Sequence, residues 1–230
     1  MRLLIHVEGQ TEETFVNEVL SPHLLSVGYT SVGARLLGNA RLKRNRGGIR
    51  SWPVVRNDIV SHLRNDTGCV ATMMVDYYGL PSEGDGAWPG RDGTAHLPAA
   101  QRAKVLEQAL KADVALAMGT SFNANRFLPF VMMYEFEGLL FSDPGAFARG
   151  IGKPGLQSEF QDIRDLFPTP EDINDSPITA PSKRVEQQMP EYEKPLFGTL
   201  AVLEIGLPRI RGECPHFAEW LSSLEALAPL

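Results

Sequence analysis

Short, almost wholly apolar runs recur through the first 150 residues of the chain, and amphipathic helical patterns separate them. The runs are at residues 2–7, 32–37, 70–75 and 130–134, and the main helical patterns are at 11–20, 49–63 and 99–111. Such runs are typical of strands buried on both faces of a parallel sheet. The alternation predicts an α/β fold with a central, mostly parallel sheet flanked by helices.

Beyond residue 150 the helical patterns continue, broken by prolines, without another set of strand patterns. We therefore expect an α/β core over residues 1–150 and a helical C-terminal extension over residues 151–230. The extension is expected to pack on the core as one structural unit.

The composition, with 43% hydrophobic and 22% charged residues, is that of a globular protein. No apolar run approaches the roughly 20 residues that cross a bilayer, and Glu8 comes too early for a secretory signal. We expect a cytoplasmic protein with no membrane partner. The chain also has no P-loop, zinc-protease or hydrolase-elbow motif.

Carboxylates follow three of the predicted strands. Glu8 and Asp76 come directly after buried runs, and Glu135 and Glu137 follow the last one. Because the carboxyl ends of parallel strands meet at one edge of a sheet, we expect these acids to converge there. Two such charges about 4 Å apart repel by roughly 4 kcal/mol at an effective dielectric near 20, so the group requires a cation or raised pKa values.

Oxygen ligands without His or Cys favour Mg²⁺ or Mn²⁺. The four acids are therefore predicted as metal ligands and catalytic groups for metal-dependent phosphodiester hydrolysis. The alternative for each is that it caps the next helix or faces solvent. Glu12 and Glu13 suit that alternative best, in the first turn of a helix capped by Thr11. Glu135 and Glu137 both follow the last strand, and Glu135 is the first candidate of the two to point into the site.

Cations form two candidate phosphate-binding groups. Between residues 35 and 64 there are eight Arg or Lys and one acid, with Arg44 and Arg46 beside two glycines, which favours contact with a nucleic-acid backbone. The alternative is a solvated loop that balances an acidic surface. The second group is Ser182, a potential N-cap, with Lys183, Arg184 and Lys194, which together would attract an anion. Its alternative is a set of surface ion pairs with Glu186, Glu191 or Glu193.

Several sequence blocks resemble the Toprim-like family labelled domain of unknown function 4276. These blocks are Val7–Glu12, Val75–Pro81, Tyr134–Phe141, Ile173–Asn174, Ala180–Arg184, Tyr192–Lys194 and Cys214–Phe217. In Toprim domains a strand-end Glu and a D-x-D pair hold Mg²⁺. Glu8 resembles that Glu and Asp76 the first Asp, whereas Tyr78 stands where the second Asp would be.

The resemblance implies a Mg²⁺- or Mn²⁺-dependent nuclease acting on DNA or RNA, of the kind found in prokaryotic phage defence with an AAA-type or ABC-type ATPase as partner. The departure at Tyr78 keeps an alternative open, in which the metal site is degenerate and the chain is a binding or regulatory module that docks on an ATPase. Nucleotidyl transfer of the primase type is a third possibility.

Overall fold

The central sheet has four parallel strands, confirming the expected α/β class. The computed structural model describes residues 1–37, 49–94, 96–173, 176 and 178–228. The strands are β1 (Arg2–Val7), β2 (Ser31–Leu36), β3 (Cys69–Asp76) and β4 (Phe127–Met132), in the order β2-β1-β3-β4. In the register of β1 and β3, Val7 lies opposite Met74, so Glu8 and Asp76 emerge at the same edge.

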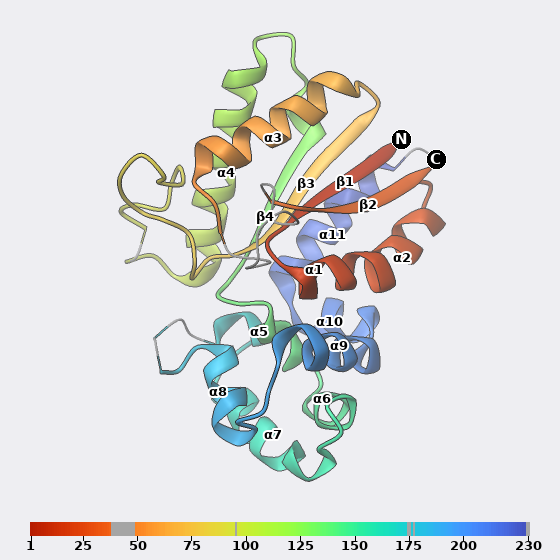
Figure 1. Ribbon diagram of the computed structural model, residues 1–230, viewed down its shortest axis with the longest axis vertical. Helices are drawn as coiled ribbons and strands as arrows, with labels where there is room; N and C mark the ends of the chain where they lie inside the picture. The colour runs from red at the N-terminus through yellow and green to blue at the C-terminus, as the bar shows by residue number, and fades with distance from the viewer. Residues whose placement is uncertain (38–48, 95, 174–175, 177, 229–230) are drawn as a thin grey trace.

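Helices cover both faces of the sheet (Figure 1). On one side lie α3 (Trp52–Asn65) and α4 (Ala99–Met118), and on the other α1 (Gln10–Phe15), α2 (Ser21–Ser26) and α11 (Pro215–Leu227). Successive strand residues alternate between two apolar clusters, with Met73 in one and Met74 in the other. This alternation follows from the two-residue period of a strand, and it explains why the central strand β3 is buried at nearly every position, whereas the edge strand β2 is mostly half-buried or exposed.

A layer of short helices lies beyond the carboxyl ends of the strands (Figure 1). It comprises α5 (Glu137–Leu140), α6 (Pro144–Gly150), α7 (Gln157–Asp165), α8 (Pro181–Gln188), α9 (Thr199–Ile205) and α10 (Leu207–Glu213), with the short turns η4 (Pro154–Leu156) and η5 (Pro170–Asp172) and the π-helical turn η6 (Lys194–Gly198). Two further turns lie outside this layer: the π-helical turn η1 (Val16–Leu20) joins α1 to α2, and η3 (Ala124–Arg126) directly precedes β4. The chain then returns to the sheet, where Trp220 of α11 stacks on Phe130 of β4 at 4.6 Å. One apolar cluster holds Phe15, Phe160 and Phe217, so the later segment shares its core with the strands.

Three predicted boundaries differ from the structure. Thr11 does not cap α1, because the cap is Gly9, whose N–H donates to the Glu12 carboxylate at 3.0 Å. Ser182 does not cap α8, because the cap is Ala180 and Pro181 takes the first helical position that its fixed φ suits. β4 ends at Met132, so Glu135 lies three residues past the strand rather than at its end.

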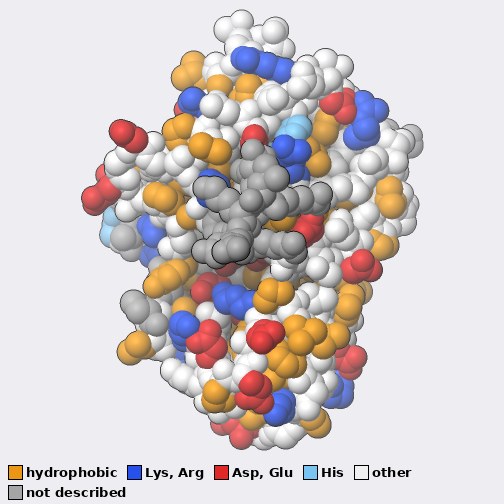
Figure 2. Space-filling view, viewed as in Figure 1, with side chains coloured by type: hydrophobic (Ala, Val, Ile, Leu, Met, Phe, Trp, Pro, Cys, Tyr) orange, Lys and Arg blue, Asp and Glu red, His pale blue; other side chains and the backbone are white. Residues whose placement is uncertain are grey.

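On the face shown in Figure 2, acidic and basic side chains are interspersed rather than segregated into fields of one sign. Within the described ranges, no helix combines the length and the apolar character needed to cross a membrane.

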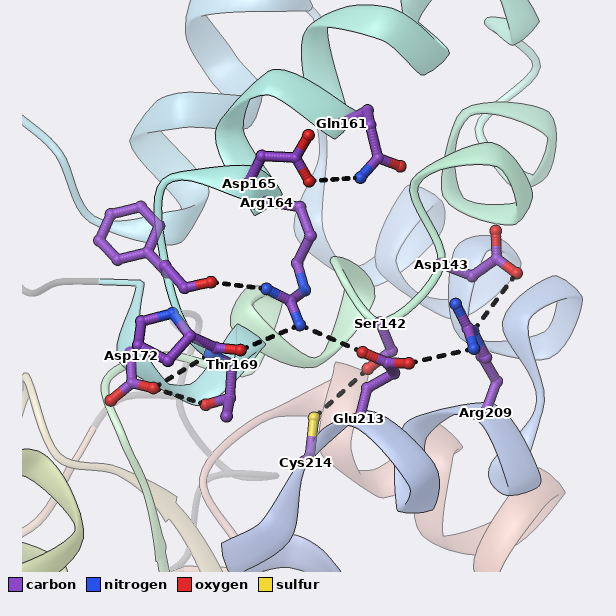
Figure 3. A network of polar contacts seen from close by, with 12 residues as sticks. Ser142, Asp143, Gln161, Arg164, Asp165, Thr169, Asp172, Arg209, Glu213 and Cys214 are labelled. Carbon is purple, nitrogen blue, oxygen red and sulfur yellow. Dashed lines mark hydrogen bonds and ion pairs between the residues drawn. The ribbon is translucent and has the colours of Figure 1, made fainter.

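An arginine ties the helical layer together (Figure 3). Arg164 of α7 donates to the carbonyl of Phe167 at 2.7 Å and to the Glu213 carboxylate at 3.1 Å, and Glu213 in turn pairs with Arg209 at 3.0 Å. Because Arg164 is largely buried, with 16% of its side chain exposed, these contacts hold α7 against α10 more firmly than surface pairs would.

Close packing of α6 on α9 gives the first testable prediction. A Cβ added at Gly150 would lie 2.7 Å from the Ala201 Cα and 2.9 Å from the Leu200 carbonyl, both of them backbone atoms. Gly150→Ala is therefore expected to lower the free energy of unfolding by about 1–3 kcal/mol, as overpacking does. The control is Gly212→Ala in α10, where no atom lies within 4 Å of the added Cβ. That change should be neutral or stabilising by up to about 1 kcal/mol, and urea denaturation compares the two.

Candidate active site

A pocket of about 250 Å³ lies at the carboxyl edge of the sheet. Its lining comes from the ends of β1 and β3, the start of α1, the first residue of α5 and the first residues of η6. The residues are Glu8, Gly9, Gln10, Thr11, Glu12, Asp76, Glu137, Lys194 and Pro195. In open α/β sheets this edge is where ligands bind. Four of the nine lining residues are acidic and one is basic.

Lys194 is the central counter-charge of the pocket. Its Nζ lies 3.0 Å from Glu137 Oε2 and 3.6 Å from Glu135 Oε1. The Glu137 side chain is only 1% exposed, whereas that of Lys194 is 41% exposed. Burial alone would lower the pKa of Lys194, but the surrounding carboxylates, led by Glu137, outweigh it and raise the pKa above its ordinary value. Lys194 is therefore charged and offsets part of the acidic charge.

Backbone amides hold two of the acids in place. The N–H of Phe136 donates to Asp76 Oδ1 at 3.0 Å, and the N–H of Ser182 donates to Glu135 Oε2 at 2.9 Å. Ser182 is in the first turn of α8, where backbone N–H groups lack helical partners. The anion that this helix end attracts is thus Glu135 of the chain itself.

Burial and neighbouring negative charges disfavour the ionised forms of the pocket's carboxyl groups. Burial raises the pKa of Asp76 well above its ordinary value, and the charges of Glu8 and Glu12 raise it further. Burial also raises the pKa of Glu137, which Lys194 partly offsets, and the pKa of Glu8. Since carboxylates in this state gain most from an added positive charge, the pocket favours a cation.

Two buried carboxylate oxygens in the pocket lack hydrogen-bond partners among the described residues, which bears on whether Mg²⁺ or Mn²⁺ could bind there. Glu8 Oε2 and Glu137 Oε1 have no hydrogen-bond partner within the described part of the chain. As the side chains stand, no three His, Cys, Asp or Glu among the described residues form a ready ligand set. Mg²⁺, however, commonly takes one or two carboxylates and completes its shell with water and substrate phosphate. Glu8 and Glu137 fit that mode.

The predicted acids and Lys194 are only partly brought together. Glu8, Asp76, Glu137 and Lys194 line the pocket. Glu135 touches Lys194 but does not line the pocket, so Glu137 rather than Glu135 is the inward residue, because the chain turns after Met132 and α5 begins at Glu137.

Lys183 and Arg184, the two other predicted cations that the structure describes, do not line the pocket. Lys183 pairs with Glu186, the surface alternative, and Arg184 donates to the Thr179 carbonyl at 2.8 Å and stacks over Phe167. Arg44 and Arg46 fall outside the described residues.

Glu12 is the site residue that sequence reasoning missed. Its acceptance of the Gly9 N–H matches the helix-start role expected of it, yet the residue is 7% exposed and lines the pocket. Helical spacing could not have found it, because α1 begins only at Gln10 and Glu8 lies before the helix. Burial raises the pKa of Glu12 to about 7, and the charges of Glu8 and Glu137 add to the effect.

This pKa predicts how stability depends on pH. Because the folded value lies above the ordinary 4.5, Glu12 favours the fold below about pH 4.5, and the benefit is lost as pH rises through 7. Glu12→Gln keeps an acceptor for Gly9 and is expected to raise the free energy of unfolding by up to about 3 kcal/mol at pH 8, at about 1.4 kcal/mol per pKa unit. The stability gained by Glu12→Gln should shrink as pH falls below 7 and vanish below about pH 4.5. Thermal melting of the unmodified protein and of Glu12→Gln across this pH range checks the prediction. A difference in stability that does not change with pH would contradict it.

A second and larger groove, of about 340 Å³, runs along the outer edge of β4. Four of its charged groups pair with one another, His216 with Glu107 at 2.9 Å and Lys104 with Glu219 at 3.1 Å. Glu107 also accepts the N–H of Val131 on the outer edge of the strand at 2.9 Å. These side chains cover the exposed edge of the sheet along β4. The acidic pocket is therefore the better candidate for an active site despite its smaller volume.

Comparison with known proteins gives one match. No curated protein and no solved structure matches the chain. A family model, described as domain of unknown function (DUF4276), matches residues 7–225, which include Glu8, Asp76, Glu137 and Lys194. The chain therefore belongs to the DUF4276 family of proteins.

Proposed function

We propose that this protein is a Toprim-like nuclease that uses Mg²⁺ or Mn²⁺ to hydrolyse phosphodiester bonds of DNA or RNA. One observation carries the proposal. Glu8, Asp76 and Glu137, which are far apart in the sequence, line one pocket at the carboxyl edge of a parallel sheet, and two of them have buried oxygens without partners among the described residues. The likeness of Glu8 and Asp76 to the Toprim acids supports it.

The residues would act as follows. Glu8 and Glu137 would hold the cation, which when bound polarises the phosphate and acidifies water. Asp76, anchored by the Phe136 N–H and with a raised pKa, would accept the proton of the attacking water as its oxygen bonds to phosphorus. Lys194 would stabilise the negative charge on the phosphoryl oxygens. The departing oxygen leaves with the bonding electron pair and takes a proton from solvent.

Cleavage assays test the proposal. Purified protein is incubated with plasmid DNA and with tRNA in Mg²⁺, in Mn²⁺ and in EDTA. We expect cleavage that requires the divalent cation. No cleavage of either substrate, together with no cation-induced rise in melting temperature, would contradict it.

The position of Lys194 supports a second candidate. Its ammonium group already supplies positive charge to Glu135 and Glu137, and Tyr78 replaces the second Asp of the Toprim pair. In this reading the metal site is degenerate, and the chain is a cytoplasmic regulatory module that docks on an AAA-type or ABC-type ATPase of a defence system. The same assays separate the two, because a degenerate site neither cleaves nor gains stability from Mn²⁺.

A further inference from the structure

A second group of side chains, not part of the acidic pocket, lies at the same edge of the sheet. Tyr77 and Tyr78 directly follow Asp76, the last residue of β3. Their backbone N–H groups donate to the carbonyls of Met132 and Tyr134, at 2.9 and 3.2 Å. These bonds extend the pairing of β3 with β4 past the acid and fix the position of both tyrosines beside it.

The two tyrosines differ sharply in exposure. Tyr77 is 1% exposed and packs edge-on against Tyr134, whereas Tyr78 is 42% exposed. A large aromatic side chain exposed two residues from a candidate catalytic acid is suited to stacking on the face of a base. Tyr78 is also the residue that replaces the second acid of the Toprim pair, so the exchange substitutes an aromatic surface for a charge.

An arginine contacts the buried tyrosine of this pair, Tyr77. The guanidinium of Arg91 lies 3.9 Å from the centre of the Tyr77 ring, and its Nη1 donates to the Tyr77 hydroxyl at 2.6 Å. Its buried Nε has no acceptor within the described residues, and no ion pair there involves Arg91. Since a guanidinium carries five N–H donors, Arg91 keeps donors and a full positive charge for a phosphate.

The segment that carries Arg91 is well anchored. Trp88 is 2% exposed, and its indole N–H donates to the Arg50 carbonyl at 2.9 Å while its ring packs against Trp52 at 5.1 Å. The Arg91 N–H in turn donates to the Trp88 carbonyl at 3.0 Å. A cation held this firmly loses little side-chain freedom when it binds a ligand.

We propose that Tyr78 and Arg91 form a subsite for single-stranded nucleic acid next to the acidic pocket, with Tyr78 stacking on an unpaired base and Arg91 binding a neighbouring phosphate. This inference rests on the proposed function, because it names the form of substrate which that pocket would cleave. In a duplex both faces of each base are covered by neighbouring pairs, so a stacking side chain selects the single strand.

Binding measured without divalent cations tests the subsite separately from catalysis. Fluorescence anisotropy of a labelled single-stranded oligonucleotide, as DNA and as RNA, is compared with the matching duplex in EDTA at low salt. We expect tighter binding of the single strand. Tyr78→Ala should weaken that binding by roughly 5- to 100-fold, whereas Tyr78→Phe should retain it. The control is Leu116→Ala, an 82% exposed apolar residue at the far end of α4, which should change nothing.

The salt dependence tests Arg91 in a way that a merely structural role would not reproduce. Arg91→Ala should reduce the slope of log affinity against log salt by about 0.7, the value for one lost phosphate contact on a single strand. The control is Arg209→Ala, whose exposed guanidinium pairs with Glu213 in the helical layer (Figure 3) and which should leave the slope unchanged.

The outcomes separate the two proposals. Equal affinity for duplex and single strand, or unchanged binding by both Tyr78→Ala and Arg91→Ala, would overturn the subsite even if the protein cleaves nucleic acid. Selective binding of the single strand that depends on Tyr78 would support the subsite even if no cleavage occurs in Mg²⁺ or Mn²⁺, in which case the nuclease proposal alone fails.

Discussion

Glu8→Gln and Asp76→Asn are each expected to reduce cation-dependent cleavage by roughly 100-fold or more while leaving the fold intact. Loss of a residue that only orients a metal ligand commonly costs 10- to 100-fold, so loss of a ligand or of the proton acceptor should cost at least as much. The measurement is the initial rate of cleavage at saturating Mg²⁺ or Mn²⁺. The control is Glu186→Gln, which removes a carboxylate paired with Lys183 at the surface and should not change the rate.

The same variants should be more stable than the unmodified protein when no metal is present. Burial and neighbouring negative charge raise the pKa values of Glu8 and Asp76, so their ionised forms cost folding free energy at neutral pH, and the neutral amides remove this cost. Loss of activity together with a higher melting temperature in EDTA is the expected signature. Addition of Mn²⁺ should raise the melting temperature of the unmodified protein but much less that of Glu8→Gln. Full activity in both variants would remove these residues from the site.

Lys194→Met is expected to destabilise the protein by about 2–4 kcal/mol at neutral pH. Removal of one partner of a buried pair typically costs 3–5 kcal/mol, and the 41% exposure of the Lys194 side chain reduces this through solvent screening. The cost arises mainly at Glu137, whose 1% exposed carboxylate loses its counter-charge. Urea denaturation provides the measurement, with Lys183→Met as the matched control, because its exposed pair with Glu186 should contribute only about 0–1 kcal/mol.

The pH dependence of that loss distinguishes electrostatics from packing. Without Lys194, the pKa of Glu137 in the folded state rises further above its ordinary 4.5, since Lys194 is what lowers it. A carboxyl with a raised folded pKa supports the fold at low pH and loses that support as pH rises through the folded value. The deficit of Lys194→Met should therefore be largest at neutral and alkaline pH and shrink toward pH 5. Mn²⁺ should also reduce it by supplying positive charge. A deficit independent of both would indicate lost side-chain packing instead.

The strands could be predicted because their signal is local. A strand buried on both faces must be mostly apolar, and four of the six residues at 2–7 and five of the six at 70–75 are, so β1 and β3 were placed within a residue or two. Glu8 and Asp76 were predicted at one edge because parallel strands end on the same side, and the structure places them there. Their catalytic role stays a prediction.

Residues outside the strands were harder to predict, because their environment comes from distant segments. Nothing near Glu12 in the sequence indicates that it is buried beside Asp76 and Glu137. Lys194 was predicted to contact phosphate, which stays a prediction, but its place 3.0 Å from Glu137, a residue 57 positions away, was not predicted. The Ser182 N–H, expected to attract a ligand anion, is bound to Glu135.

The sequence by itself determined the α/β class and the two acids at the strand ends, because a strand's two-residue period and its apolar content are written in consecutive residues. Only the tertiary structure decided that Glu137 rather than Glu135 faces the pocket, that Lys194 neutralises it, and that Tyr78 stands exposed beside it. These outcomes depend on how the helical layer docks on the sheet edge, and burial, pKa and ion pairing all follow from contacts between segments that the order of residues does not reveal.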